Sequence, residues 1–307
     1  MGQFVVETAV VEAGGSIGFA GSYLKLARPK QWTKNGFVLA GVVFGGEALS
    51  AYSVLSALLA FVAFCALSGA VYAGNDVLDV EEDRKHPLKR RRPVASGVIS
   101  PRSALVFAAV LGCAGLALGF FVSPGVGFAG LAYLVLQAIY TPLLKHTAIL
   151  DVMSISTGFV IRALAGVAAV GVRISPWLIV CTGLLTLFLG FTKRRHELAA
   201  LGEGAVAHRK NLRDYSVPML DEMMNIMISA TIIAYTLYTF FEYDNVFMMA
   251  SIPFVIYGVF RYMLLVHRDG GGNPDTLLLR DRPLQITLLL WLAVVMMVLY
   301  GLPLWNA

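Results

Sequence analysis

The chain has 307 residues, of which 58% are hydrophobic and only 14% are charged, and its formal net charge is +5. Soluble domains carry about 25% charged residues, so this composition excludes an ordinary soluble protein and indicates an integral membrane protein. The start of the chain lacks the basic region of a signal peptide, so we expect a short tail over 1–22 and one membrane domain over 23–307. The three cysteines, Cys65, Cys113 and Cys181, lie in apolar runs and suggest neither a disulfide nor a zinc framework.

Nine apolar runs follow one another along the chain, each near the length of about 20 residues that a helix needs to cross a bilayer. They predict an all-α bundle of nine transmembrane helices. The expected spans are 34–49, 51–75, 102–122, 125–144, 148–171, 175–192, 218–241, 246–266 and 283–302.

The distribution of Lys and Arg favours this number of spans. If successive loops alternate between the two sides of the membrane, 21 of the 24 Lys and Arg fall on the side of the N-terminus, and only Arg173 falls on the other. Because positively charged loops face the cytoplasm, the sequence predicts a multi-pass plasma-membrane protein with its N-terminus inside and its C-terminus outside. Most acidic residues share the inner loops, so we expect an active site that faces the cytoplasm.

An acidic segment directly follows the second apolar run. Asn75, Asp79 and Asp83 are spaced by four residues, which predicts that they share one helix face, with Asp76 adjacent to it. Anionic groups at the end of a membrane helix are costly unless a cation lies there. Oxygen ligands suit Mg²⁺, which commonly holds a phosphate or diphosphate. The alternative interpretation is a solvated helix end with Glu–Lys pairs.

Other charged side chains gather at the same predicted membrane boundary. Lys34 begins the first run and would point toward a pocket. Arg162 lies deep in the fifth run, where a charge should face the bundle interior and find a partner. Asp151 shares its helix face, so these two residues form either a structural ion pair or part of a substrate site. Lys193 and Glu197, at the end of the sixth run, either set the topology or clamp a phosphate. The further candidates for substrate binding are Arg84, Tyr140, Lys145, Arg194, Arg280 and Arg282.

The acidic segment, "NDVLDVEED", has the pattern N-D-x-x-D-x-x-x-D and resembles the first aspartate-rich motif of the UbiA prenyltransferase superfamily. Members of that superfamily are nine-helix intramembrane enzymes with cytoplasmic cap loops and a lateral opening to lipid. The resemblance covers essentially the whole chain, including Tyr140 and Lys145 after the fourth run. It implies that Asn75, Asp79 and Asp83 hold Mg²⁺ on a diphosphate.

One segment departs from the superfamily pattern. Typical members carry a second motif, D-x-x-x-D, after the sixth helix, but here the segment from Lys193 to Glu197 reads Lys-Arg-Arg-His-Glu. A site that exchanges an acid for bases should take a donor with more phosphate charge than a prenyl diphosphate, and phosphoribosyl pyrophosphate (PRPP) meets that requirement. Together with "RPKQW" and "LRDR", this segment resembles the decaprenyl-phosphate phosphoribosyltransferase branch of the superfamily.

The resemblance implies a Mg²⁺-dependent membrane glycosyltransferase. It would move a 5-phosphoribosyl group from PRPP to a polyprenyl (decaprenyl) phosphate and release diphosphate, in the synthesis of precursors for cell-wall arabinan. The expected catalytic residues are Asp76, Asp79, Asp83, Lys193 and Glu197. The expected partners are PRPP, the polyprenyl phosphate and the membrane, with no nucleic acid, and a homo-oligomer is left open.

Two alternatives remain at this point. A UbiA-type prenyltransferase that joins a prenyl diphosphate to an aromatic acceptor should have the second aspartate motif, which this sequence lacks. A transporter or lipid-binding scaffold should have internal repeats and ionisable residues near the midplane of several helices. Arg162 is the one clear charge in the middle of a predicted span, and no repeat is evident.

Overall fold

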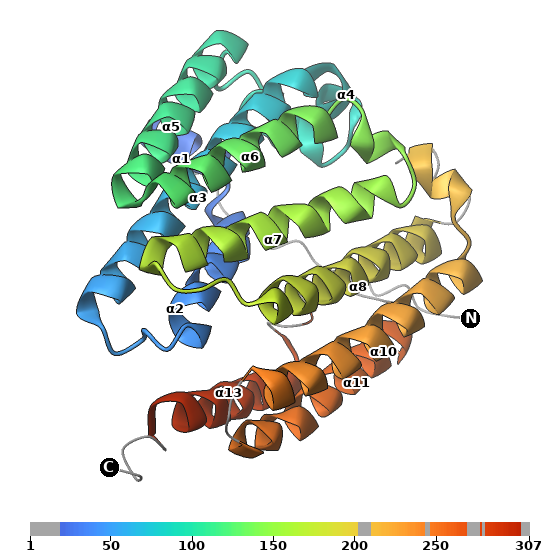
Figure 1. Cartoon of the computed structure of the whole chain (residues 1–307). Helices are drawn as coiled ribbons and strands as arrows, with labels where there is room; N and C mark the ends of the chain where they lie inside the picture. Colours follow the sequence, from blue (N-terminus) through green and yellow to red (C-terminus); the bar gives the residue numbers. More distant parts are fainter. Residues whose placement is uncertain (1–18, 202–209, 243–245, 269–276, 278–279, 302–307) are drawn as a thin grey trace.

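The computed structural model describes residues 19–201, 210–242, 246–268, 277 and 280–301. Every regular element in these ranges is a helix, in agreement with the predicted all-α class. Figure 1 shows two groups of helices, with α1 to α7 in blue to green and α8 to α13 in yellow to red. The packing of α8 against α7 and α10 joins the two groups. The expected tail over 1–22 falls largely outside the described residues.

The first group contains ten elements. They are α1 (Phe19–Ala27), the 3₁₀-helix η1 (Pro29–Leu39), α2 (Ala40–Phe44), α3 (Ala51–Leu78), α4 (Val80–Lys85), the 3₁₀-turn η2 (Lys89–Arg91), α5 (Pro101–Val122), α6 (Pro124–Tyr140), the 3₁₀-turn η3 (Leu144–His146) and α7 (Leu150–Val170).

The second group contains seven elements. They are α8 (Pro176–Leu201), η5 (Lys210–Asp214), α10 (Val217–Phe241), η6 (Val246–Ser251), α11 (Ile252–Arg268), α13 (Arg282–Met296) and the π-helical turn η7 (Met297–Gly301). Several helices in both groups begin at a side chain that accepts a hydrogen bond from a free backbone N–H of the first turn. These capping residues are Ser50, Ser100, Ser123, Ser216 and Asp281.

Seven of the described helices are long and apolar enough to cross a membrane. They correspond to seven of the nine predicted spans, and the run at 125–144 forms a shorter apolar helix, Pro124–Tyr140. The first predicted span, 34–49, does not form one continuous α-helix. It divides into the end of η1, the short α2 and a turn that begins at Gly45.

A close backbone approach accounts for the shape of this first segment. A Cβ atom at Gly166 in α7 would lie 1.8 Å from the Val38 carbonyl oxygen of η1, and one at Gly41 in α2 would lie 2.3 Å from the Gly166 carbonyl carbon. Only glycine at both positions allows this contact. The η1–α2 segment therefore rests directly on the backbone of α7.

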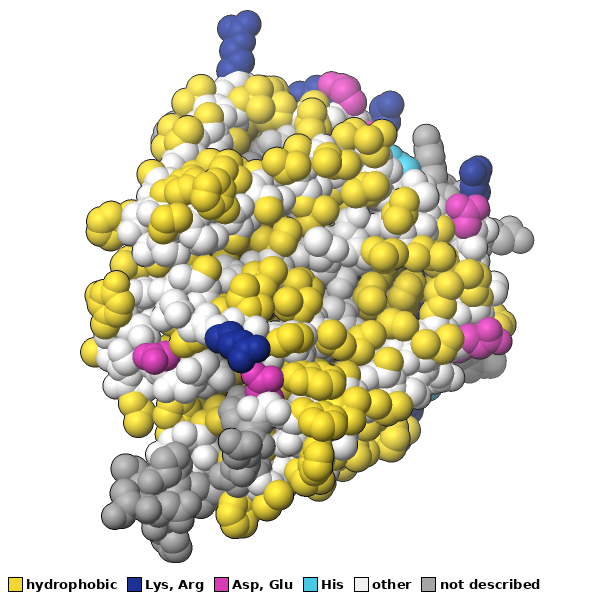
Figure 2. Space-filling view, viewed as in Figure 1, with side chains coloured by type: hydrophobic (Ala, Val, Ile, Leu, Met, Phe, Trp, Pro, Cys, Tyr) yellow, Lys and Arg dark blue, Asp and Glu magenta, His cyan; other side chains and the backbone are white. Residues whose placement is uncertain are grey.

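Apolar and charged side chains occupy different parts of the surface. In Figure 2, hydrophobic side chains cover most of the visible face, whereas Lys, Arg, Asp and Glu gather mainly along its upper and right-hand margin. In Figure 1 this margin contains α4, the connection between α6 and α7, and the facing ends of α8 and α10. An apolar belt with charges collected at one end is the surface that a bilayer-spanning bundle requires.

Candidate functional site

The aspartate-rich segment lies across the junction between two helices. Asn75 and Asp76 belong to the last turn of α3, Asp79 is the junction residue, and Asp83 belongs to α4. Backbone hydrogen bonds continue through the junction, from the Asp79 N–H to the Asn75 carbonyl (2.9 Å) and from the Asp83 N–H to the Asp79 carbonyl (2.8 Å). The segment is thus a nearly continuous helix with a local departure from helical dihedral angles at Asp79, where ψ is 7°.

Two of its carboxylates are buried and share one arginine. Asp76 and Asp83 are each only 2% exposed. The Arg92 Nη1 atom lies 2.5 Å from Asp83 Oδ2 and 3.4 Å from Asp76 Oδ1, and Arg28 forms a second ion pair with Asp76. Arg92 directly follows η2, and Arg28 directly precedes η1. Basic side chains from two other segments therefore close over the acidic pair.

The other two polar residues of the segment face the end of α6. Asn75 Oδ1 accepts a hydrogen bond from the Thr141 hydroxyl (3.1 Å), and Asp79 Oδ1 lies 3.5 Å from Lys145 Nζ. The structure therefore divides the predicted set between two groups of partners. Asp83 shares Arg92 with Asp76, about two helical turns earlier, whereas Asn75 and Asp79 contact the segment that ends α6 and follows it.

The donor set of this segment fits one particular type of metal site. In the described part of the chain, no group of three or more His, Cys, Asp or Glu side chains converges as a metal cage would require. Mg²⁺ is commonly bound through one or two carboxylates, with substrate phosphates and waters completing its coordination. The buried pair Asp76 and Asp83, with Asn75 and Asp79 beside it, fits such a partial site.

A second charged cluster connects α7 and α8. Asp151 in α7 is fully buried and Arg194 in α8 is 1% exposed, and Arg194 Nε lies 2.8 Å from Asp151 Oδ2. Arg194 Nη1 also donates to Glu197 Oε2 at 2.5 Å. Since two carboxylates and the bundle enclose Arg194, the geometry favours a positioning role for it. The direct phosphate contact expected of Arg194 stays a prediction, as does that of Lys193, which is half-buried in the same turn.

Tyr215 completes this cluster. Its hydroxyl accepts a hydrogen bond from the Ile149 N–H (2.5 Å) and lies 3.4 Å from Asp151 Oδ1. Burial raises the pKa of Tyr215 above its usual value, so the hydroxyl stays protonated and can donate to the carboxylate. The hydrogen bond from the Ile149 N–H also stabilises an unusual backbone conformation. Ile149 has a positive φ of 65° immediately before α7, which a β-branched residue rarely adopts.

The end of α6 links the two clusters. Thr141 contacts Asn75 of the aspartate-rich segment, whereas its neighbour Tyr140 interacts electrostatically with Arg194. Residues predicted from four separate apolar runs therefore meet at one end of the bundle.

Arg162 has a different partner from the one its spacing suggested. Its Nε donates to Asn35 Oδ1 (2.7 Å), its Nη1 donates to the Gly158 carbonyl (2.8 Å), and its guanidinium lies 4.6 Å from the centre of the Tyr133 ring. Of the two alternatives, the structural ion pair with Asp151 is wrong, because Asp151 is paired with Arg194, and the substrate-binding role of Arg162 stays a prediction. Amide and carbonyl oxygens and an aromatic face stabilise this buried cation instead.

The remaining predicted residues lie around the charged end. Lys34 is partly buried in η1, and Arg84 is exposed and paired with Glu81 at 3.0 Å. Arg280 and Arg282 are both exposed and flank Asp281. Asp281 caps α13 and forms an ion pair with Arg261 at 2.8 Å, and the hydrogen bonds from Arg261 lower the pKa of Asp281. Asp281 thus caps the last helix.

Sequence reasoning missed several residues of the site. Arg28, Arg92 and Thr141 contact the aspartate-rich segment, and Tyr215 contacts Asp151. Arg92 belongs to a basic run that was interpreted only as a topology signal. A usable signal was present, because two buried acids next to a membrane span require nearby cations.

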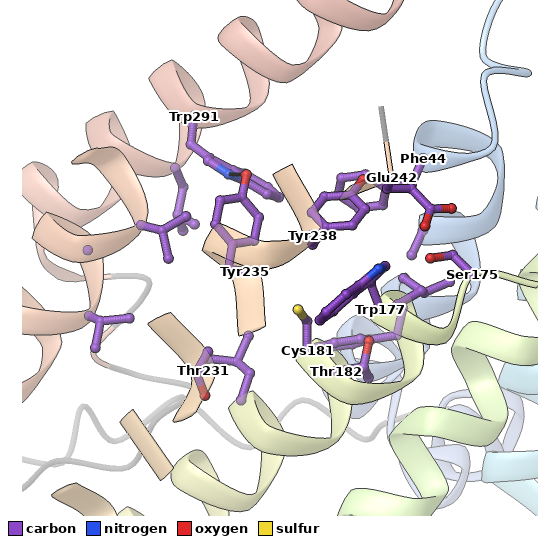
Figure 3. Close-up of a pocket in the computed structure, with 18 of the residues that line it drawn as sticks. Phe44, Ser175, Trp177, Cys181, Thr182, Thr231, Tyr235, Tyr238, Glu242 and Trp291 are labelled. Atoms are coloured by element: carbon purple, nitrogen blue, oxygen red, sulfur yellow. Dashed lines mark hydrogen bonds between the residues drawn. The ribbon is translucent and has the colours of Figure 1, made fainter. Parts of the chain in front are cut away.

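An apolar cavity of about 480 Å³ lies between the second helix group and the α2 and α7 segments. Figure 3 shows Trp177, Tyr235, Tyr238 and Trp291 around it, with the thiol of Cys181 directed toward the same space. Its lining follows α8 from Trp177 to Leu189. That stretch corresponds to about 18 Å of helix and ends roughly one turn before Lys193.

The helical bundle, its charged end and its aromatic-lined cavity define a multi-pass membrane protein that places a polar site beside a space suited to an apolar chain. The chain belongs to the UbiA prenyltransferase family, which its residues 36–289 match.

Relatives of known name support this membership. The chain is 37% identical to the decaprenyl-phosphate phosphoribosyltransferase of Mycobacterium tuberculosis, over 89% of this chain and 92% of that protein. It is 33% identical to the enzyme of the same name from Corynebacterium glutamicum, over 92% of this chain and 88% of that protein. A solved UbiA homologue from Archaeoglobus fulgidus, bound to DMAPP and Mg²⁺, has a TM-score of 0.71 at 19% identity, covering 91% of this chain and 99% of that one. This last likeness concerns the fold alone.

Proposed function

We propose that this protein transfers a 5-phosphoribosyl group from PRPP to a polyprenyl phosphate, with decaprenyl phosphate as the expected acceptor, and releases diphosphate. The observation that carries the proposal is that two charged clusters, linked through the end of α6, lie at the same end of the bundle. One cluster is acidic and the other carries Lys193 and Arg194 where a second aspartate motif would be expected. The names of the 37% and 33% identical relatives support the same reaction.

The acidic cluster would hold the diphosphate end of the donor. The buried pair Asp76 and Asp83, with Asp79 and Asn75 beside it, would bind Mg²⁺ together with oxygens of the diphosphate, and the ion when bound would neutralise charge on the leaving group. Lys145, 3.5 Å from Asp79, would add a further positive charge beside the leaving group. Lys193 would contact the 5-phosphate, while the buried Arg194 fixes the orientation of Asp151 and Glu197.

The acceptor needs no general base, because its phosphate is already an anion. A direct displacement by a phosphate oxygen would form the new bond at the ribose anomeric carbon as the bond to diphosphate breaks. That reaction inverts the anomeric centre from α to β. The positive charge that develops on the ribose would be stabilised by the nearby carboxylate of Glu197.

The isoprenoid chain would lie in the apolar cavity. A cavity of about 480 Å³ would hold only part of a long polyprenyl chain. The rest of a long chain would lie in the bilayer through a lateral opening. The proposed topology keeps nine membrane segments, with the charged end and the N-terminus in the cytoplasm.

The decisive experiment incubates the purified protein in detergent with radiolabelled PRPP, Mg²⁺ and decaprenyl phosphate, and follows label into the lipid fraction. We expect transfer that requires all three components. Arg102→Gln serves as a control, since Arg102 is exposed at the start of α5 and belongs to neither cluster. If the protein instead alkylates a phenolic acid with a prenyl diphosphate and ignores PRPP, the aromatic prenyltransferase alternative replaces this proposal.

A further inference from the structure

Each carboxylate of the aspartate-rich segment already has a basic partner. Arg92 bridges Asp83 and Asp76, Arg28 pairs with Asp76, and Lys145 lies against Asp79. These three cations come from three segments that are separate in the sequence. On each aspartate, one of the two oxygen atoms that a divalent metal could use therefore binds one of these cations.

The two arginines are held in place by other contacts. Arg28 has φ of 51°, a left-handed conformation that turns the chain between α1 and η1, and its guanidinium lies 5.0 Å from the centre of the Tyr72 ring. Arg92 precedes Pro93, which restricts its backbone, and its own N–H donates to the Lys89 carbonyl. The approach of both guanidinium groups to the acids is thus part of the fold.

The charges of the two buried aspartates and the two arginines decide whether a metal ion or a diphosphate can bind at this cluster. Two carboxylates that are 2% exposed are costly to bury as anions unless a cation lies beside them, and Arg92 supplies one. A free divalent ion between Asp76 and Asp83 would compete with that guanidinium, and displacing it would separate the arginine from its carboxylate partners at the membrane boundary. A diphosphate changes the outcome, because guanidinium groups bind phosphate oxygens as well as they bind carboxylates.

We propose that Arg92, together with Arg28, prevents a free divalent cation from binding Asp76 and Asp83. The two carboxylates are released only when the diphosphate of the donor binds the two guanidinium groups in their place. The inference rests on the proposed function, whose donor carries that diphosphate. Arg92 is then a positioning residue that couples metal binding to donor binding. By linkage, PRPP strengthens metal binding by the same factor by which the metal strengthens PRPP binding.

Mn²⁺ bound to the full-length protein in detergent tests this coupling, with electron paramagnetic resonance reporting the free ion. For the wild type we expect weak binding of Mn²⁺ alone and much tighter binding when PRPP is present. Arg92→Gln should bind Mn²⁺ alone about 10- to 100-fold more tightly, the factor that corresponds to one charge-assisted hydrogen bond. The same variant should lose most of the enhancement by PRPP, and Arg92→Lys should restore part of it.

Arg91→Gln is the matched control, because Arg91 is exposed in η2, directly before Arg92 in the chain. It should behave as the wild type. If Arg92→Gln does not fold, Arg28→Gln removes the other guanidinium from Asp76 and carries the same expectation.

Other results would separate this inference from the proposed function. Mn²⁺ affinity that is independent of PRPP and unchanged in both variants would overturn the coupling, while Mn²⁺-dependent transfer to the lipid would leave the proposed function intact. Transfer that proceeds without any divalent ion would overturn the metal role itself, and the inference with it.

Discussion

Replacing Asp151 with Asn should lower the free energy of unfolding far more than the removal of an exposed charge would. Asp151 is fully buried, and its partner Arg194 is 1% exposed. Removing one partner of a buried ion pair costs about 3–5 kcal/mol, because the other charge stays in a medium that solvates it poorly. Glu197 remains 2.5 Å from Arg194 and compensates in part, so we expect a loss near the lower limit, about 3 kcal/mol.

Unfolding of the purified protein in detergent, followed by helical circular dichroism, measures this loss. Asp214→Asn is the matched control, since Asp214 forms a surface pair with Arg213 at 3.4 Å and is half exposed. That change should cost less than about 1 kcal/mol. The double variant Asp151→Asn with Arg194→Met removes both buried charges and should recover at least half of the loss.

Two results would refute this reasoning. One is an Asp151→Asn protein as stable as the Asp214→Asn control. The other is an Arg194→Ala protein of unchanged stability that binds PRPP weakly, which would mean that Arg194 contacts the phosphate directly, as its place in the sequence predicted.

Three further predictions concern single residues. Asp79→Asn should abolish transfer while leaving the unfolding temperature nearly unchanged, because Asp79 is only partly buried; retained activity at limiting Mg²⁺ would contradict its role. Lys193→Ala should weaken PRPP binding, measured by calorimetry, by about 1.5–3 kcal/mol, with a smaller effect on diphosphate alone; equal losses for the two ligands would place Lys193 at the diphosphate. Because the pKa of Asp281 is lowered in the folded protein, its ion pair with Arg261 stabilises the fold fully above the unfolded Asp pKa of about 3.9, and this contribution is lost as the pH falls through the lower folded value. Asp281→Asn should therefore flatten this part of the acid unfolding profile. An unchanged profile would show that the pair contributes nothing to stability.

The spans and the acidic segment could be read from the sequence because each is a local pattern. Apolar runs and the spacing from Asn75 to Asp83 are visible within about 20 residues. The partners of the acids were not visible in this way. Arg28 lies 48 residues before Asp76, and Lys145 lies 66 residues after Asp79, so only the folded bundle brings them together.

The partners of residues that share a helix face were also hidden. Asp76 and Asp83, about two helical turns apart, share Arg92, whereas Asp79 pairs with Lys145. The pairing of Arg162 with Asn35 spans 127 residues and replaces the shorter-range ion pair that helix periodicity suggested. Periodicity predicts which residues share a face but does not predict which neighbouring helix supplies the partner.

The glycine contact between η1 and α7 lies far from the charged site, in the last turns of α7, yet it fixes how the two segments are placed. Backbone meets backbone at Gly166, so no side chain is present to absorb a displacement. Arg28 stands at the start of η1, and Asp151 stands at the start of α7, about 22 Å of helix from Gly166. A single added methyl group there would push apart two segments that each carry a charged residue to the same end of the bundle. Substitutions that touch no substrate and alter no charge can therefore impair the site from a distance.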